Sequence, residues 1–171
     1  MTSRIGPSTT AGPRSWTENW PCPSVPTRRH QKVTYRLGRD IGPFVESRAL
    51  GDFYDCPIHV ILDEHVHYEP DLCFIARGRD TDPDSSVFRG APDLIIEILS
   101  PSNRQHHTET KFRHYEQYGV REYWLVDPDE ESIQVWRLVD GKYTLLGEFG
   151  RGLTVATRVL EGLSLDPAQV A

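Results

Sequence analysis

The sequence has no long apolar run and few cysteines, and each absence excludes a class of protein. None of its stretches approaches the roughly 18 consecutive apolar residues of a membrane span, and the polar start MTSRIGPSTTAGPRSWTENW lacks the apolar segment of a secretory signal. We therefore expect a soluble, cytoplasmic protein without a membrane partner. The 3 cysteines, Cys22, Cys56 and Cys73, form no CxxC pair, so neither a disulfide framework nor a zinc knuckle is predicted.

Positive charge is also scarce. The chain has 19 Lys and Arg against 25 Asp and Glu, a formal net charge of -6, which argues against a protein that coats nucleic acid through bulk electrostatics. A local basic groove remains open, as does the alternative that the basic residues lie on ordinary solvated faces. The candidates for a groove are Arg28, Arg29, Lys32, Arg36 and Arg39 on one segment and Arg104, Lys111 and Arg113 on another.

The length of 171 residues and the 37% hydrophobic content suit one domain with a sizeable core. Residues 1–27 are rich in Ser, Thr, Pro and Gly and predict an irregular or disordered lead-in, so the domain is expected over 28–171. Apolar residues recur at helical spacing from Arg28 to Leu50. Gly42-Pro43 should kink or interrupt this helix, and Gly51 should end it.

The following segments alternate between strand and helix signals. The runs CPIHVIL and HVHYEPDLCFIA alternate at period two around the turn DEH, which predicts an antiparallel hairpin. APDLIIEILS is apolar on nearly all sides and is expected at the centre of the sheet. Ser102 or Asn103 can cap a helix that runs to about Tyr118 and ends at Gly119. REYWLVD, SIQVWRL and KYTLLGEF predict further strands, and 153–166 a final extended segment. The predicted class is α/β, a mixed β-sheet flanked by helices.

Two acids interrupt the most apolar of these strands. Burying an ionised carboxylate without a partner is costly, and in a strand Asp93 and Glu97 point to the same face. The preceding hairpin adds Asp71, where Pro70 suggests an edge or bulge that re-aims a side chain; Glu69 shares its face if that strand is regular. The next helix adds Lys111, on one stripe with His107, His114, Tyr115 and Tyr118.

These three acids and the lysine can come together in one site. Oxygen ligands suit magnesium, which binds through carboxylates, water and substrate phosphate, and a nearby ammonium can orient a metal-bound water for phosphodiester hydrolysis. This interpretation makes Asp71, Asp93 and Glu97 the metal ligands and Lys111 the water-orienting group. The alternative is structural: Asp93 caps a turn, Glu97 pairs with an Arg or Lys, and Asp71 closes a turn.

Other chemistry-bearing residues are expected to be structural. His65-Val66-His67 fits a hairpin turn better than a metal element, and His106-His107 fits a solvated pair better than a ligand set. The strand aromatics are expected in the core or in cross-strand pairs, not on a base-stacking platform. These are Tyr123, Trp124, Trp136 and Tyr143.

Several of these motifs, in this order, resemble the Uma-two family of restriction endonucleases, a branch of the PD-(D/E)xK nuclease superfamily. The motifs are EPDLCFIA, GAPDLIIEILSPS, KFRHYEQY, GVREYWLVDP and IQVWRL, and the likeness spans about residues 26–166. The resemblance implies a restriction-endonuclease-like α/β core and cleavage of DNA that depends on Mg2+, with Mn2+ able to substitute. Because cutting both strands usually takes two sites, a homodimer is a further expectation, although no residue of the sequence points to it.

The resemblance also assigns roles by position. Asp71 would be the aspartate of the PD element, Glu97 the acid of the (D/E)xK element, and Asp93 an additional acid. Leu99 stands where the superfamily lysine would be, so Lys111 would take that role from the adjoining helix.

The resemblance fails at one point, ahead of the first helix. Family members usually open with a helix and a hairpin that contributes a further glutamate, where this chain has RSWTENWPCPSVPT. The alternative function is therefore a catalytically impaired, non-enzymatic nucleic-acid-binding or assembly module of the same fold.

Overall fold

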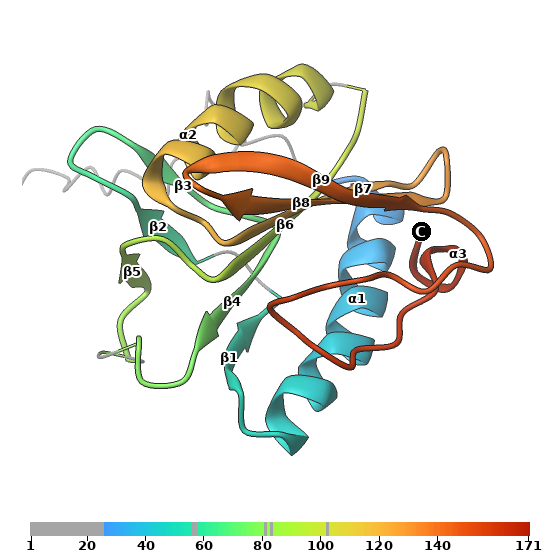
Figure 1. Ribbon diagram of the computed structural model, residues 1–171, viewed down its shortest axis with the longest axis horizontal. Helices are drawn as coiled ribbons and strands as arrows, with labels where there is room; N and C mark the ends of the chain where they lie inside the picture. Colours follow the sequence, from blue (N-terminus) through green and yellow to red (C-terminus); the bar gives the residue numbers. More distant parts are fainter. Residues whose placement is uncertain (1–25, 56–57, 81, 83, 102) are drawn as a thin grey trace, which may run out of the picture.

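A computed structural model of the protein describes residues 26–55, 58–80, 82, 84–101 and 103–171 (Figure 1). Cys22, Cys56, Ser102 and all of the predicted lead-in except Pro26 and Thr27 lie outside the described residues. Across the described ranges, no helix is long and apolar enough to cross a membrane.

The main sheet has six strands in the order β1-β4-β6-β7-β8-β9. Their bounds are β1 Gly51–Tyr54, β4 Leu72–Ala76, β6 Leu94–Ile98, β7 Glu122–Asp127, β8 Ser132–Val139 and β9 Lys142–Phe149. Only β6 and β7 pair in parallel, and the other neighbours are antiparallel. The mixed sheet and the interior place of the apolar strand β6 are therefore confirmed, as are the three strands expected after residue 120.

A second sheet of three strands has the order β3-β2-β5, with β2 His59–Ile61, β3 His67–Tyr68 and β5 Val87–Arg89. Strands β2 and β3 form the expected antiparallel hairpin. Its turn is closed by Asp63, whose Oδ1 accepts from the N–H groups of His65 and Val66. The run 65–76, expected to be one strand, is divided at Pro70: β3 pairs in the small sheet and β4 in the large one. Asp71 lies where the chain changes sheets.

Helix α1, Arg28–Ser47, begins with Thr27 as its cap, since the Thr27 side chain accepts from the N–H of His30. Gly42-Pro43, expected to kink or interrupt this helix, does not interrupt it, because α1 continues through Pro43. Its buried stripe continues on both sides of the proline, and the packing of that stripe outweighs the lost backbone bond. Gly51 does not end the helix either. It opens β1, where an added Cβ would lie 2.1 Å from the carbonyl oxygen of Ile75.

The crossover between β6 and β7 contains the π-helix η1, His106–Lys111, followed by α2, Phe112–Tyr118. Gly119 ends α2 in the left-handed conformation, φ 87°, as predicted. Asn103 does not form a helix cap of the expected kind. Its side chain accepts from Ser100 N–H and donates to the carbonyl of Ile98.

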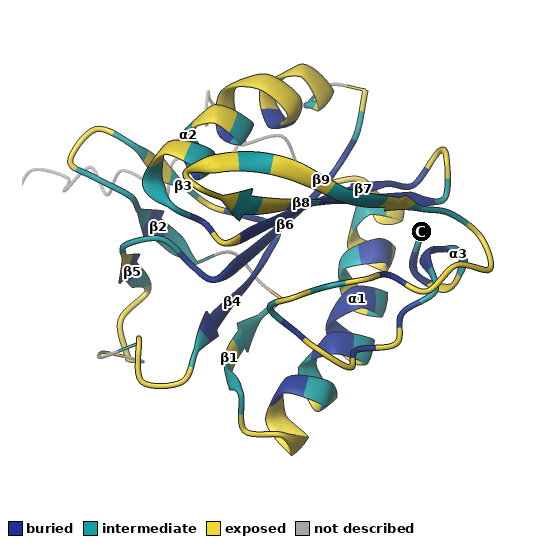
Figure 2. Ribbon diagram, viewed as in Figure 1, coloured by how far each residue is buried: buried dark blue, intermediate teal, exposed yellow. Residues whose placement is uncertain are grey.

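The sheet separates two cores. Helix α1, segment 153–166 and the short helix α3, Pro167–Val170, cover one face, whereas α2 and the small sheet cover the other. In Figure 2, β4 and β6 have the dark blue of buried residues. Trp124 and Tyr123 are fully buried, one in each core, so the expectation that they are core residues is confirmed. Segment 153–166, expected to be extended, contains neither a strand nor a helix.

Candidate active site

The pairing of β4 with β6 brings two of the predicted acids together. Leu72 lies opposite Ile96 in this antiparallel pair, so the same register carried one residue further sets Asp71 opposite Glu97. Directly opposite residues project to the same face with Cβ atoms about 4.5 to 5.5 Å apart. Asp71 is also anchored to β6, since its Oδ2 accepts from the N–H of Ile98 at 2.7 Å. The two carboxylates are therefore neighbours.

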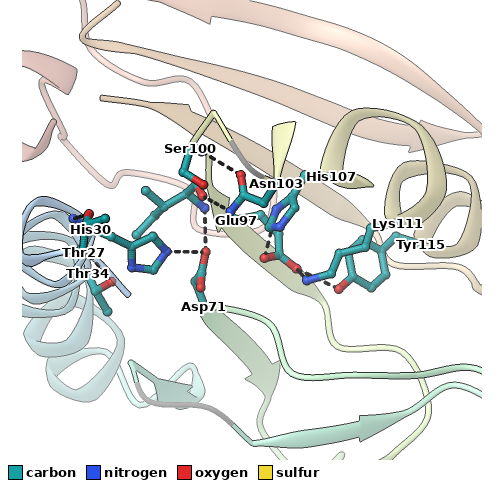
Figure 3. A network of polar contacts seen from close by, with 11 residues as sticks. Thr27, His30, Thr34, Asp71, Glu97, Ser100, Asn103, His107, Lys111 and Tyr115 are labelled. Atoms are coloured by element: carbon teal, nitrogen blue, oxygen red, sulfur yellow. Dashed lines mark hydrogen bonds and ion pairs between the residues drawn. The ribbon is translucent and has the colours of Figure 1, made fainter. Parts of the chain in front are cut away.

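Glu97 is fully buried, and its two oxygens have different surroundings (Figure 3). Oε1 accepts from Lys111 Nζ at 2.6 Å and from the Tyr115 hydroxyl at 2.9 Å. Oε2 has no hydrogen-bond partner. It faces His107 Nδ1 at 3.2 Å, but the two atoms are not aligned for a hydrogen bond, and Nδ1 is likewise without a partner. Lys111 and Glu97 are thus brought together as predicted.

Burial governs the charges of Glu97 and His107. It raises the pKa of Glu97 to about 7, against the opposing effect of the Lys111 charge. Burial also lowers the pKa of His107 to about 3, so the imidazole is neutral at neutral pH. Glu97 Oε2 and the neutral imidazole of His107 then lie side by side in the interior, and neither Oε2 nor Nδ1 makes a hydrogen bond. A buried carboxylate oxygen left in this way favours a proton or a cation.

His30, in the first turn of α1, contacts the other carboxylate. Its Nε2 lies 3.1 Å from Asp71 Oδ2. Burial alone would raise the pKa of Asp71, but the hydrogen bonds from His30 and Ile98 N–H and the charge of Lys111 outweigh it and lower that pKa. The hydrogen bond to Asp71 raises the pKa of His30. His30 was not among the residues predicted from the sequence, although it extends the buried stripe Val33, Leu37, Ile41 and Val45 by one turn.

The π-helix η1 presents both His107 and Lys111 to Glu97. Single π-turns are rare and often lie at functional sites. His107, Lys111 and Tyr115 are the buried residues of η1 and α2, so this part of the predicted stripe is confirmed. The expectation that His107 is solvated is wrong, since it is 6% exposed.

The other two members of that stripe point to the small sheet instead. His114 Nδ1 lies 2.6 Å from the Tyr68 hydroxyl, and the Tyr118 hydroxyl donates to Asp63. These contacts attach α2 to the β2–β3 hairpin and do not reach Glu97.

Asp93, the third predicted acid, is not brought to this site. Four residues of strand separate it from Glu97 by about 13 Å. Its Oδ2 accepts from Ala76 N–H at 2.8 Å and from Arg79 at 2.5 Å, and its Oδ1 accepts from Arg121 at 3.1 Å. Asp93 is therefore satisfied by structural partners, but these are a neighbouring strand's N–H and two arginines rather than the turn considered from the sequence.

Glu69 does not share the site of Asp71, because the strand is not regular there. Its side chain is 64% exposed and lies 3.6 Å from His59 Nδ1. Several groove candidates are likewise engaged elsewhere, as the solvated-face alternative expects. The contacts are the ion pairs Arg29–Asp129, Arg39–Asp40 and Arg104–Asp127, and the bond from Arg36 to the carbonyl of Ala171.

The donor set fits a divalent ion of the magnesium type through two acids, not three. Within the described part of the chain, no three His, Cys, Asp or Glu side chains are grouped so as to hold a metal. Magnesium, however, usually binds one or two carboxylates and takes its other ligands from water and substrate phosphate. Glu97 Oε2, a buried oxygen without a hydrogen-bond partner on the carboxylate that neighbours Asp71, is the observation that supports this fit.

The comparisons with known proteins agree with this architecture. The model of the Uma2 (Uma-two) family, described as "Putative restriction endonuclease", matches residues 18–168. The chain belongs to this family. It also resembles the crystal structure of "a putative nuclease belonging to DUF820" from Anabaena variabilis, with a TM-score of 0.72 and 21% identity over 85% of this chain and 81% of that chain. The predicted restriction-endonuclease-like fold is confirmed. Among curated proteins, the chain has no significant match.

Proposed function

We propose that this protein is a magnesium-dependent DNA endonuclease that hydrolyses phosphodiester bonds. The observation that carries the proposal is the buried Oε2 of Glu97, which has no hydrogen-bond partner although it lies beside Asp71 and a lysine. Membership of a family described as restriction endonucleases supports the same reaction class.

Each side chain of the site has a task in this proposal. Asp71 and Glu97 would hold Mg2+, for which Mn2+ can substitute, and the bound ion supplies a polarised phosphoryl oxygen and a water of lowered pKa. His30 and Ile98 N–H fix the orientation of Asp71. Tyr115, through its hydroxyl, fixes that of Glu97.

Lys111 is the proposed water-orienting group. Its Nζ is bonded to Glu97 Oε1 and lies 5.4 Å from the centre of the Tyr68 ring. A fixed ammonium at this point can orient the attacking water and stabilise negative charge that develops on the phosphate. Leu99, at the position of the superfamily lysine, is 8% exposed and belongs to the core. It has no charged group, so in this proposal Lys111 orients the water.

The proposed substrate is DNA. Cutting both strands of a duplex takes two such sites, which a homodimer would supply. Asp93 has no part in the chemistry, because Arg79 and Arg121 already neutralise it.

The test is cleavage of supercoiled plasmid and of single-stranded circular DNA by the purified protein with Mg2+, Mn2+ or EDTA. We expect cleavage with either metal and none with EDTA. Glu97→Gln and Asp71→Asn should each lose it by about 100-fold or more. Glu69→Gln is the matched control, because this exposed carboxylate lies two residues from Asp71 and should cut at the wild-type rate. Wild-type protein without metal-dependent cleavage would favour the non-enzymatic module.

A further inference from the structure

A pocket opens directly beside Asp71 and His30, between α1 and the end of β1. Its volume is about 340 Å³, and its walls are Pro26, His30, Gln31, Thr34, Tyr35, Asp55 and Asp71. Ligand pockets begin at roughly this size, which suits a single planar ring system. Because the pocket shares Asp71 and His30 with the candidate active site, whatever fills it lies next to the scissile phosphate.

Tyr35 is an unusual wall for such a pocket. It is 66% exposed, the most exposed large hydrophobic side chain among the described residues. Tyr35 lies one helical turn after Gln31 on α1, so the ring and the amide project from the same side of the helix. An exposed aromatic face beside an amide offers both stacking and hydrogen bonding to a flat polar ring.

Charge indicates what can enter. Asp55 and Asp71 line the pocket, and His30 is the one basic side chain among its walls, so a second phosphate would be repelled there. A nucleobase is uncharged and would not be. Asp55 can accept hydrogen bonds from the amino groups of a base edge, as carboxylates do from cytosine.

We propose that this pocket binds one unpaired DNA base adjacent to the scissile phosphate, stacked on Tyr35. The inference rests on the proposed nuclease function and adds a substrate class to it. A base within a duplex is stacked and paired and cannot enter a side pocket unless it is extruded. The preferred substrate is therefore single-stranded or locally unpaired DNA.

The pairing of several basic residues with acids supports this choice. Binding a duplex relies on many Lys and Arg contacts to phosphate, but Arg29 and Arg39 on α1 are already paired with Asp129 and Asp40. Stacking of bases on aromatic side chains supplies affinity for single strands without such a surface.

The test measures binding in EDTA, so that it does not depend on cleavage. Labelled single-stranded oligonucleotides and their duplexes are titrated with the full chain, and one adenine is replaced by an analogue whose fluorescence is quenched by stacking. We expect the single strand to bind more tightly and its fluorescence to fall. Tyr35→Ala should raise the single-strand Kd roughly 10-fold and abolish the quenching, while leaving the duplex Kd unchanged.

Two variants serve as controls. Tyr35→Phe keeps a ring and should retain both the affinity and the quenching. Leu153→Ala removes a side chain that is 53% exposed and is not a pocket wall, so it should match the wild type. A Tyr35→Ala variant that binds and quenches like the wild type, or a wild type that binds the duplex as tightly as the single strand, overturns the base pocket.

The two proposals fail separately. Metal-dependent cleavage by the wild type combined with an unchanged Kd in Tyr35→Ala overturns the base pocket and leaves the nuclease standing. Binding that depends on Tyr35 in a protein that never cleaves overturns the catalytic proposal and leaves the single-strand site.

Discussion

Strand β6 has a buried carboxylate near each end, and the two carboxylates have opposite surroundings. Asp93 is 1% exposed and Glu97 0%, so burial does not distinguish them. Asp93 accepts three hydrogen bonds spread over both oxygens. Glu97 accepts two, both on Oε1, and its Oε2 has none. Buried polar atoms are nearly always hydrogen-bonded, and the exception at Glu97 lies at the end of the strand where we propose that the metal binds.

The largest expected effect tests whether the lysine at the Glu97 end is catalytic. Lys111→Ala should lower the cleavage rate by about 100-fold or more, because it removes the group that stabilises charge in the transition state. Binding of Mg2+ should remain or become slightly tighter, since a neighbouring positive charge opposes the metal. Cleavage rates and the thermal midpoint with and without Mg2+ provide both readouts.

Lys142→Ala is the control for this variant. Lys142 is 81% exposed and pairs with Glu116 away from the site, so its loss should change neither readout. A Lys111→Ala protein that cuts like the wild type would remove the lysine from the mechanism.

The next effect compares the two carboxylates directly by replacing each with its amide. Asp93→Asn sets an NH2 group against at least one of the donors that Asp93 now accepts from, and it removes the charge that faces Arg79 and Arg121. These changes should cost about 1.5 to 3 kcal/mol of folding free energy. Glu97→Gln keeps an acceptor for Lys111 and Tyr115.

The side-chain amide that Glu97→Gln introduces can also donate to the unpartnered His107 Nδ1. The free energy of unfolding of this variant should therefore stay within about 1 kcal/mol of wild type or rise. Urea titrations of both variants measure the difference. If Glu97→Gln proves the more destabilised of the two, Glu97 is half of a structural ion pair.

A smaller effect is expected from pH. The pKa of Glu97 is about 7 in the folded protein and 4.5 in its ordinary state, so between these values the folded protein binds more protons than the unfolded chain. Rising pH therefore removes stability over this range.

Binding of a divalent ion needs the ionised carboxylate of Glu97, so the effect of Mg2+ on the thermal midpoint should also depend on pH. The rise in thermal midpoint caused by Mg2+ should be larger near about pH 8 than near about pH 6. Glu97→Gln should lose this pH dependence. An Mg2+ effect of equal size at both pH values would show that Glu97 does not titrate on binding.

The smallest effect concerns the arginines at the Asp93 end. The Arg79 side chain is 42% exposed and that of Arg121 63%, and each can be replaced while the other remains. Arg79→Met or Arg121→Met alone should cost no more than about 1 kcal/mol, and the double variant should cost more than the sum of the two. Thermal melts of the three proteins test this redundancy.

The sequence predicted the pairing of Asp71 with Glu97 but not the exclusion of Asp93. Period-two alternation correctly indicates which residues share a face. It does not say that four residues along a strand exceed the span of one metal site. The partners of Asp93 could not be predicted either, because Arg79 and Arg121 lie 14 and 28 residues away in the sequence. No local pattern links them to Asp93.

Other features depend on tertiary contacts that the pattern does not contain. The π-turn in η1 has the same apolar spacing as an ordinary helix, so the sequence predicted the stripe but not its geometry. Gly51 looked like a helix end, but its role is to let β1 approach the carbonyl of Ile75. His30, by contrast, could have been found, since a polar residue at the end of a buried helical stripe is a candidate for a site.

The most direct test of the account is the Mg2+-induced change in thermal midpoint of three proteins: the wild type, Asp93→Asn and Glu97→Gln. Binding to the folded state raises the midpoint, and only one end of β6 offers an unsatisfied oxygen. The account predicts that Mg2+ raises the midpoint of the wild type and of Asp93→Asn by the same amount and has no effect on Glu97→Gln. A shift that survives in Glu97→Gln, or that disappears in Asp93→Asn, would contradict it.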